Sequence, residues 1–207
     1  MRNRIFIGLF YTIGLAILSL GISLIIVADL GAGPWDAFYV ALSDTIGLTV
    51  GSWIFIVGAA LILINGWLMK QKPDVLAVVT IVIIGGLIDF WLLVAFTKWD
   101  PGAAAVQTLV LLTGITLIGI GVSCYLQSNF GRNPIDNLMV AVHKRTGKSL
   151  SMSKTMIEVS VLIIVFFING PIGIGTVIIA FGIGPLIQVF HKPITRFRTQ
   201  KLGIPVS

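Results

Sequence analysis

Six apolar runs, each long enough to cross a lipid bilayer as a helix, limit this chain to one class of fold. They cover roughly residues 5–28, 50–69, 74–97, 105–128, 152–169 and 171–191, and one crossing needs about 20 apolar residues. Because the bilayer core holds no water for backbone amides, such runs span it as helices. The sequence therefore predicts an all-α membrane protein, a six-helix transmembrane bundle forming a single membrane domain over residues 1–207.

The basic residues support six spans and predict their orientation. Of the 14 Lys and Arg residues, all except Lys98 fall on the cytoplasmic side if the N-terminus is placed in the cytoplasm. This asymmetry is the one that the positive-inside rule describes, and a different number of spans would scatter the charges. We therefore expect both termini in the cytoplasm, and we attribute the net charge of +6 to topology, with no nucleic-acid partner.

The chain also contains an internal repeat. Segment 31–36, Gly-Ala-Gly-Pro-Trp-Asp, recurs one hundred residues later as segment 131–136, Gly-Arg-Asn-Pro-Ile-Asp. Each copy of this segment lies in a repeat unit of three spans. Because three is an odd number, the second unit enters the membrane from the side opposite to the first. The sequence predicts two inverted three-span repeats, residues 5–97 and 105–191, an arrangement frequent in secondary transporters. The structural motif shared by the copies consists of Gly31, Pro34, Gly131, Asn133 and Pro134.

A short helix is expected after each glycine-rich break, at residues 34–46 and 134–146. Asn133 is a favourable N-cap, and proline suits the first position of a helix. The two helices could lie flat at the membrane interface as elbows or be re-entrant. Lys144 and Arg145 favour the flat alternative, because a helix running inward from the surface would carry them toward the hydrocarbon core.

Glycines predict how the first and fourth spans meet. Gly14 and Gly21 are seven residues apart and share one helix face, and Gly114 and Gly121 have the same spacing. Small residues let membrane helices approach closely, where lipid provides no hydrophobic drive for association. We therefore expect these two spans to pack together along their glycines.

Asp89 is the most conspicuous polar residue within an apolar span. It has no basic residue within one helical turn, and acidic residues inside membranes often mark ion or proton paths. The alternative is a packing role, with the carboxylate hydrogen-bonded to a hydroxyl or to the backbone of a neighbouring helix.

Four further charged residues are candidates for a substrate or ion path. Asp36 and Asp136 occupy the same place in the two copies, where they complement the positive end of a helix dipole. They could also face a shared cavity in which two helix N-termini hold a polar or anionic ligand, with Arg132 as the anion partner. Glu158 is explained more simply by an ion pair with Lys154, four residues earlier.

Catalytic and metal chemistry find little support in the sequence. The chain has one cysteine, Cys124, and two histidines, too few for the usual Cys/His metal site. No catalytic triad, phosphate-binding loop or pair of catalytic carboxylates occurs at recognisable spacing. We expect no enzyme activity, no metal and no cofactor.

Three sequence patterns carry a family resemblance. The run from Gly31 to Phe38, the segment 51–53 (Gly-Ser-Trp) and the pattern Gly131-x-x-Pro134-x-Asp136 resemble the YczE/YyaS/YitT group of bacterial integral membrane proteins, most closely its YczE-like branch. The resemblance covers most of the chain. It implies a multi-pass protein of the bacterial plasma membrane with a compact fold, and it brings no catalytic or binding residues.

The architecture predicts a small permease for an unidentified small solute. The alternative is a non-transporting scaffold or accessory subunit that binds another membrane protein or a second copy of the chain. A permease needs a polar cavity at the interface of its repeats, whereas a scaffold has a dry core. In both cases the lipid bilayer is the main partner.

Overall fold

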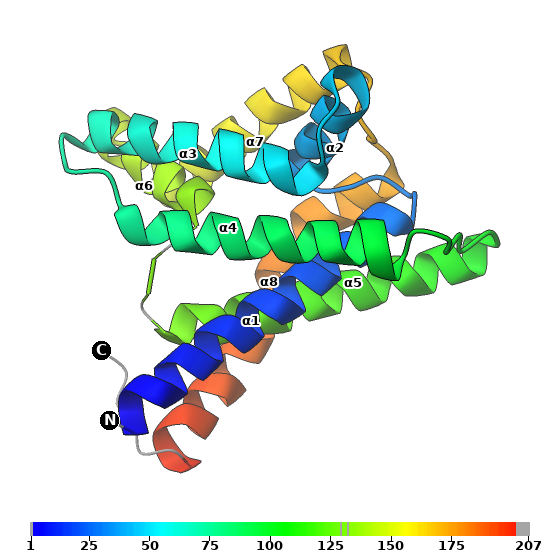
Figure 1. Ribbon diagram of the computed structural model, residues 1–207. Coiled ribbons are helices and arrows are strands. Elements are labelled where there is room, and N and C mark those ends of the chain that lie inside the picture. The colour runs from blue at the N-terminus through cyan, green and yellow to red at the C-terminus, as the bar shows by residue number, and fades with distance from the viewer. Residues whose placement is uncertain (1, 129, 132, 202–207) are drawn as a thin grey trace.

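The computed structural model describes residues 2–128, 130–131 and 133–201, and these residues form helices and connecting loops with no strand (Figure 1). The eight α-helices within them are α1 (Arg2–Val27), α2 (Pro34–Ile46), α3 (Val50–Met69), α4 (Val75–Phe90), α5 (Ala104–Tyr125), α6 (Pro134–Thr146), α7 (Leu150–Phe167) and α8 (Ile174–Arg196). Shorter turns extend three of them: η1 (Trp91–Ala95) follows α4, η2 (Leu126–Ser128) follows α5 and η3 (Phe197–Lys201) follows α8.

Six of these segments are long and apolar enough to cross a membrane, which confirms the predicted all-α fold with six apolar spans. They are Phe6–Val27, Val50–Met69, Val75–Ala95, Ala104–Ser128, Leu150–Phe167 and Ile174–Thr199. The last span is longer than its sequence suggested, because α8 continues as a helix through Lys192 and Pro193. The two remaining helices, α2 and α6, are the short ones expected after the glycine-rich breaks.

Polar side chains set the starts of several helices. The Thr49 side chain accepts a hydrogen bond from the Ser52 amide at the start of α3, and Asp74 does the same for Leu76 at the start of α4. Asn133 and Ser149 cap α6 and α7 in the same way. Each cap satisfies an amide that has no partner within its helix.

The first and fourth spans, α1 and α5, pack together along glycines, as predicted. A Cβ atom added at Gly21 would lie 2.7 Å from the Gly114 carbonyl oxygen, and one added at Gly121 would lie 2.8 Å from the Gly14 carbonyl oxygen. The two backbones therefore touch where only glycine fits. This contact is the centre of the bundle (Figure 1).

The short helices pack on the opposite half of the chain. α2 lies against α7, α6 lies against α3, and α4 and α8 flank α1 and α5 respectively. Gly170, at the end of α7, sits against Ala37 and Ala41 of α2. At the other short helix, the Asn65 side chain of α3 donates a hydrogen bond to the Pro134 carbonyl, 2.8 Å away. Each half of the sequence thus contributes one short helix that packs against a long helix of the other half.

The two halves differ in how their last two spans are arranged. α3 and α4 pack side by side, with the Gly51 carbonyl oxygen 2.7 Å from where a Cβ of Gly85 would stand. α7 and α8, both described throughout, make almost no contact and lead away from the connector 168–173 in different directions (Figure 1). α8 packs on α5 instead.

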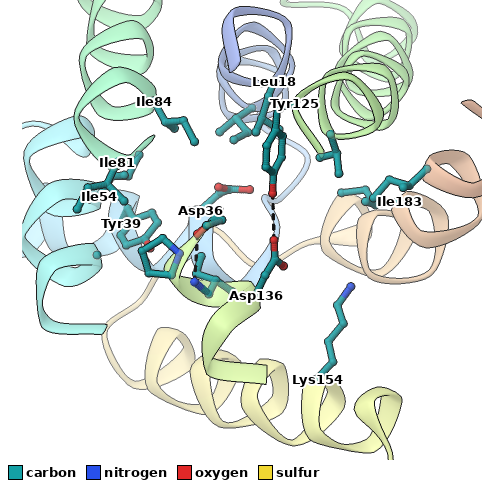
Figure 2. A pocket seen from close by; sticks show the side chains of 17 residues that line it. Leu18, Asp36, Tyr39, Ile54, Ile81, Ile84, Tyr125, Asp136, Lys154 and Ile183 are labelled. Atoms are coloured by element: carbon teal, nitrogen blue, oxygen red, sulfur yellow. Dashed lines mark hydrogen bonds between the residues drawn. The ribbon is translucent and has the colours of Figure 1, made fainter. Parts of the chain in front are cut away.

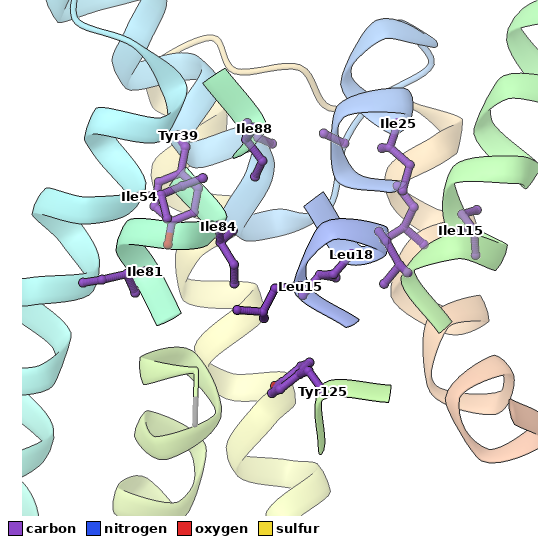
Figure 3. Packing of buried hydrophobic residues seen from close by; sticks show 14 of the residues in the cluster. Leu15, Leu18, Ile25, Tyr39, Ile54, Ile81, Ile84, Ile88, Ile115 and Tyr125 are labelled. Carbon is purple, nitrogen blue, oxygen red and sulfur yellow. The ribbon is translucent and has the colours of Figure 1, made fainter. Parts of the chain in front are cut away.

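Apolar side chains fill the space where α1, α4 and α5 meet (Figure 3). Leu15, Ile25, Ile88 and Leu111 are fully buried there. In a membrane, the outward faces meet lipid tails that are as apolar as the core, so close packing provides the cohesion that water-driven burial provides elsewhere.

Candidate functional site: a cavity between two helix N-termini

A cavity of about 190 Å³ lies where the two halves of the chain meet, and all eight helices contribute to its wall (Figure 2). Most of the lining is aliphatic. The polar groups are Asp36, Tyr39, Tyr125, Asn133, Asp136 and Lys154. The first turns of α2 and α6 both border it, and each brings one carboxylate.

Asp36 reaches the cavity from the first turn of α2, which begins at Pro34. Gly33 leaves room for the carboxylate, because a Cβ at that position would stand 3.0 Å from Asp36 Oδ2. Within the part of the chain that the structure describes, no hydrogen bond or ion pair reaches Asp36. α2 is not one of the six spans, and burial within the protein raises the pKa of Asp36 to about 7.

Asp136 holds the equivalent place on α6 and is better supplied with contacts. The Tyr125 hydroxyl donates a hydrogen bond to Asp136 Oδ2 across 3.1 Å (Figure 2). Tyr39 borders the cavity from α2, and its pKa lies above the usual value because the phenol is buried and because Asp36 is nearby. The sequence hypothesis of two carboxylates at one shared cavity therefore agrees with the geometry.

Lys154 and Glu158 form the ion pair that their spacing predicted. The Lys154 ammonium lies 3.7 Å from Glu158 Oε1 on α7. Lys154 lines the cavity, whereas Glu158 lines a small pocket of about 30 Å³ beside it, together with Trp35 and Asp136. Glu158 thus has the simpler role that the sequence allowed, as a partner of Lys154.

Asp89 is not part of this cavity. It lies at the end of α4, where it accepts hydrogen bonds from the Thr49 hydroxyl at 2.6 Å and from the Gly51 amide at 2.8 Å. These contacts place the carboxylate at the N-terminus of α3, where the helix dipole favours a negative charge. Of the two sequence alternatives, the contacts favour a packing role and give no support to a proton carrier.

The remaining motif residues are structural, and Arg132 lies outside the described residues. Gly31 has a φ of +98°, which side chains disfavour, and its backbone packs on Gly173 and Gly175. Gly131 packs on the backbone of Leu76 and Ala77. Pro34 and Pro134 begin their helices and are buried. These residues hold the two helix N-termini at the cavity.

Comparison with known proteins places the chain in a family. The model of a family described as "Family of unknown function (DUF6198)" matches residues 6–192. The chain belongs to this family. It is 37% identical to the uncharacterised protein YyaS of Bacillus subtilis, over 91% of this chain and 94% of that protein. It is 35% identical to the uncharacterised membrane protein YczE of the same organism, over 89% of this chain and 84% of that protein.

These relatives confirm the resemblance that the sequence motifs carried. An uncharacterised protein of Haemophilus influenzae is also similar, at 28% identity over 88% of this chain and 82% of that protein. No solved structure matches the chain. The six apolar helices and the similarity to a membrane protein make this member of the DUF6198 family a multi-pass membrane protein.

The raised pKa of Asp36 predicts a stability that falls as the pH rises. An aspartate titrates near pH 3.9 in an unfolded chain and at about 7 in this fold, so ionisation between these values favours the unfolded state. Asp36→Asn removes that ionisation. We expect the purified variant to melt at a higher temperature than the parent at pH 8 and at the same temperature near pH 3, below the pKa of an aspartate in the unfolded chain. Equal melting temperatures at both pH values would contradict this.

Proposed function

We propose that this DUF6198 protein is a small permease whose solute binds in the cavity between α2 and α6. One observation carries the proposal. Two helices, one from each half of the chain, begin at the same cavity, and the first turn of each helix contributes one carboxylate to it. Many secondary transporters bind their substrates where interrupted helices meet between two repeats. The scaffold alternative predicts a dry core, whereas two carboxylates border this cavity.

Two inverted repeats, residues 5–97 and 105–191, are part of the proposal. The contacts support it because they are reciprocal: α2 packs on α7 as α6 packs on α3, and α1 packs on its own counterpart α5. The glycine contacts across α1 and α5 are reciprocal too: Gly21 touches Gly114, and their counterparts Gly121 and Gly14 touch each other. Such pairing is what a two-fold axis in the membrane plane would produce.

We infer further that α2 and α6 are re-entrant. The chain would enter in extended form through segment 28–33, and α2 would then lead back toward the surface. Trp35 at the start of α2 borders the same pocket as Ile157, whereas Ala41 meets Gly170 beyond the end of α7. Irregular backbone at membrane depth is tolerated where it lines a cavity. Lys144 and Arg145, which favoured flat helices, are exposed at the outward end of α6 and meet no hydrocarbon on this path.

The difference between the halves supports alternating access. Asp89 joins α4 to the start of α3 through its hydrogen bonds. Its counterpart in the second repeat is Gln188, because Leu87-Ile88-Asp89 recurs as Leu186-Ile187-Gln188, and Gln188 lies on α8, which makes almost no contact with α7. We propose that in this state the cavity is closed between α3 and α4 and open between α7 and α8. In the other state α8 would pack on α7 and α4 would leave α3. If both termini lie in the cytoplasm, the opening between α7 and α8 leads to the cytoplasm.

Thiol labelling of one cavity position tests the permease without knowledge of its solute. In a Cys124→Ser background, we expect Ile84→Cys, which lines the cavity, to react with a small membrane-impermeant thiol reagent in both right-side-out and inside-out vesicles. Ile88→Cys is the matched control, because Ile88 is fully buried one turn away on the same helix and is not among the residues that line this cavity. Reaction of Ile84→Cys from only one side, or from neither, would reject alternating access.

A further inference from the structure

The charges around the cavity favour one class of solute. Asp36 carries a full negative charge when ionised and has no cationic partner among the described residues, whereas Lys154 is paired with Glu158. The N-termini of α2 and α6 oppose the carboxylates with about half a positive charge each. At Asp36 the described residues therefore leave a net negative charge that a ligand can neutralise.

We propose that the solute of this cavity is a small organic monocation, an ammonium group on a compact apolar body, with Asp36 as its counter-charge. The inference rests on the proposed permease function. A cationic solute takes the place of the anionic ligand that two helix N-termini alone would suggest, because an aspartate in the first turn of each helix already supplies the negative charge.

Asp36 is suited to this role because it has no protein partner within the described chain. A carboxylate that stays unpaired inside a protein is unfavourable, and an ammonium ligand would supply the missing hydrogen-bond donors and charge. Asp136 differs, since Tyr125 already donates to it. Tyr39 and Tyr125 also border the cavity, and tyrosine rings attract cations through their faces.

The walls and the size favour an organic ion over a metal ion. Beyond the polar groups, the lining consists mainly of side chains such as Leu18, Ile54 and Ile84, which cannot replace the oxygen shell of about six ligands that ions such as Ca²⁺ and Mg²⁺ need. No group of three or more metal-binding side chains occurs in the described part of the chain. A dry cavity of about 150 Å³ accommodates benzene, so the 190 Å³ here fits an ion with a single ring.

The test is equilibrium binding to the purified full-length protein in detergent, followed by calorimetry at pH 8, where most of Asp36 is ionised. The probes are benzylammonium, cyclohexylammonium and tetramethylammonium, with benzyl alcohol, benzoate and sodium chloride as neutral, anionic and inorganic counterparts. We expect at least one ammonium probe to bind in preference to all three counterparts. Asp36→Asn should weaken that binding at least tenfold.

Asp44→Asn is the matched control, because Asp44 is an exposed aspartate on the same helix outside the cavity. It should bind as the parent does, and the melting temperature of Asp36→Asn shows whether that variant is folded. Binding of benzoate, benzyl alcohol or sodium ions with equal or higher affinity would overturn the inference, as would the absence of binding by every ammonium probe. Unchanged ammonium binding in folded Asp36→Asn would overturn it too.

Flux into proteoliposomes separates this inference from the proposed function. Ammonium binding at Asp36 without any flux would leave the cation site in place and remove the permease. Flux of an anionic or neutral solute that Asp36→Asn does not affect would keep the permease and overturn the cation site. Flux of the bound ammonium probe, lost in Asp36→Asn and kept in Asp44→Asn, supports both.

Discussion

Gly21→Ala and Gly121→Ala should each strongly destabilise the protein, whereas Gly8→Ala on the same helix as Gly21 should not. A Cβ at Gly21 would lie 2.7 Å from a carbonyl oxygen of α5, and one at Gly121 would lie 2.5 Å from the Leu18 amide nitrogen. Both obstacles are backbone atoms, so only a shift of a whole helix can relieve them. Overpacking of this kind costs about 3 kcal/mol, or a fall in melting temperature of about 10 °C for a chain of this length.

Gly8 is the matched control because a Cβ there has no atom within 4 Å. The measurement is thermal unfolding of the purified proteins in one detergent. If both substitutions left the melting temperature unchanged, α1 and α5 could not be packed along these glycines.

Asp89→Leu is expected to have a comparable effect for a different reason. The substitution removes the acceptor for the Thr49 hydroxyl and the Gly51 amide, and it places a larger apolar side chain against the start of α3. Loss of two hydrogen bonds to a charged group costs about 3 kcal/mol or more. Asp44→Leu, which replaces an exposed aspartate, should have little effect on thermal unfolding.

Asp89→Asn separates stability from gating. The amide oxygen keeps one of the two acceptor positions, so the variant should fold with a smaller loss of stability. Because the fastening of α4 to α3 is weakened, Ile84→Cys should be labelled faster from the external side in this variant than in the parent. Slower or unchanged labelling in a folded variant would mean that Asp89 only stabilises the fold.

Much of the fold follows from one-dimensional patterns. The six apolar runs correspond to the six long helices, and the spacing of Gly14 and Gly21 predicted the contact between α1 and α5. Asn133 was recognised as the N-cap of α6 because that signal is local. The separation of α7 from α8 could not be predicted, since adjacent antiparallel spans with a short connector, such as 168–173, give no local sign of how far they diverge.

The preference for flat short helices came from one geometric assumption. It supposed that the helix itself descends from the surface, which would take Lys144 and Arg145 inward. In the re-entrant path that we propose, the extended segment leads inward and the helix leads back toward the surface. A sequence shows where a helix begins, but it does not show in which direction its axis points.

The site was only partly predictable. The equal positions of Asp36 and Asp136 in the two copies indicated a shared location, and the cavity contains both. Tyr125 was missed because it is an ordinary aromatic residue near the end of an apolar run. The hydrogen bonds of Asp89 could not be predicted, because its partner Thr49 lies 40 residues away and leaves no signal in the sequence next to Asp89.

The exchange of short helices between the halves has a consequence for synthesis and membrane insertion. α2 ends at Ile46, and the helix on which it packs, α7, begins at Leu150. At about 5–20 residues per second, the ribosome needs on the order of ten seconds to produce the second after the first. During that interval the segment that holds Asp36 can pack only on α1 and α3 of its own chain. The face of α2 that later packs on α7 is therefore covered by lipid or by the insertion machinery until the second half emerges.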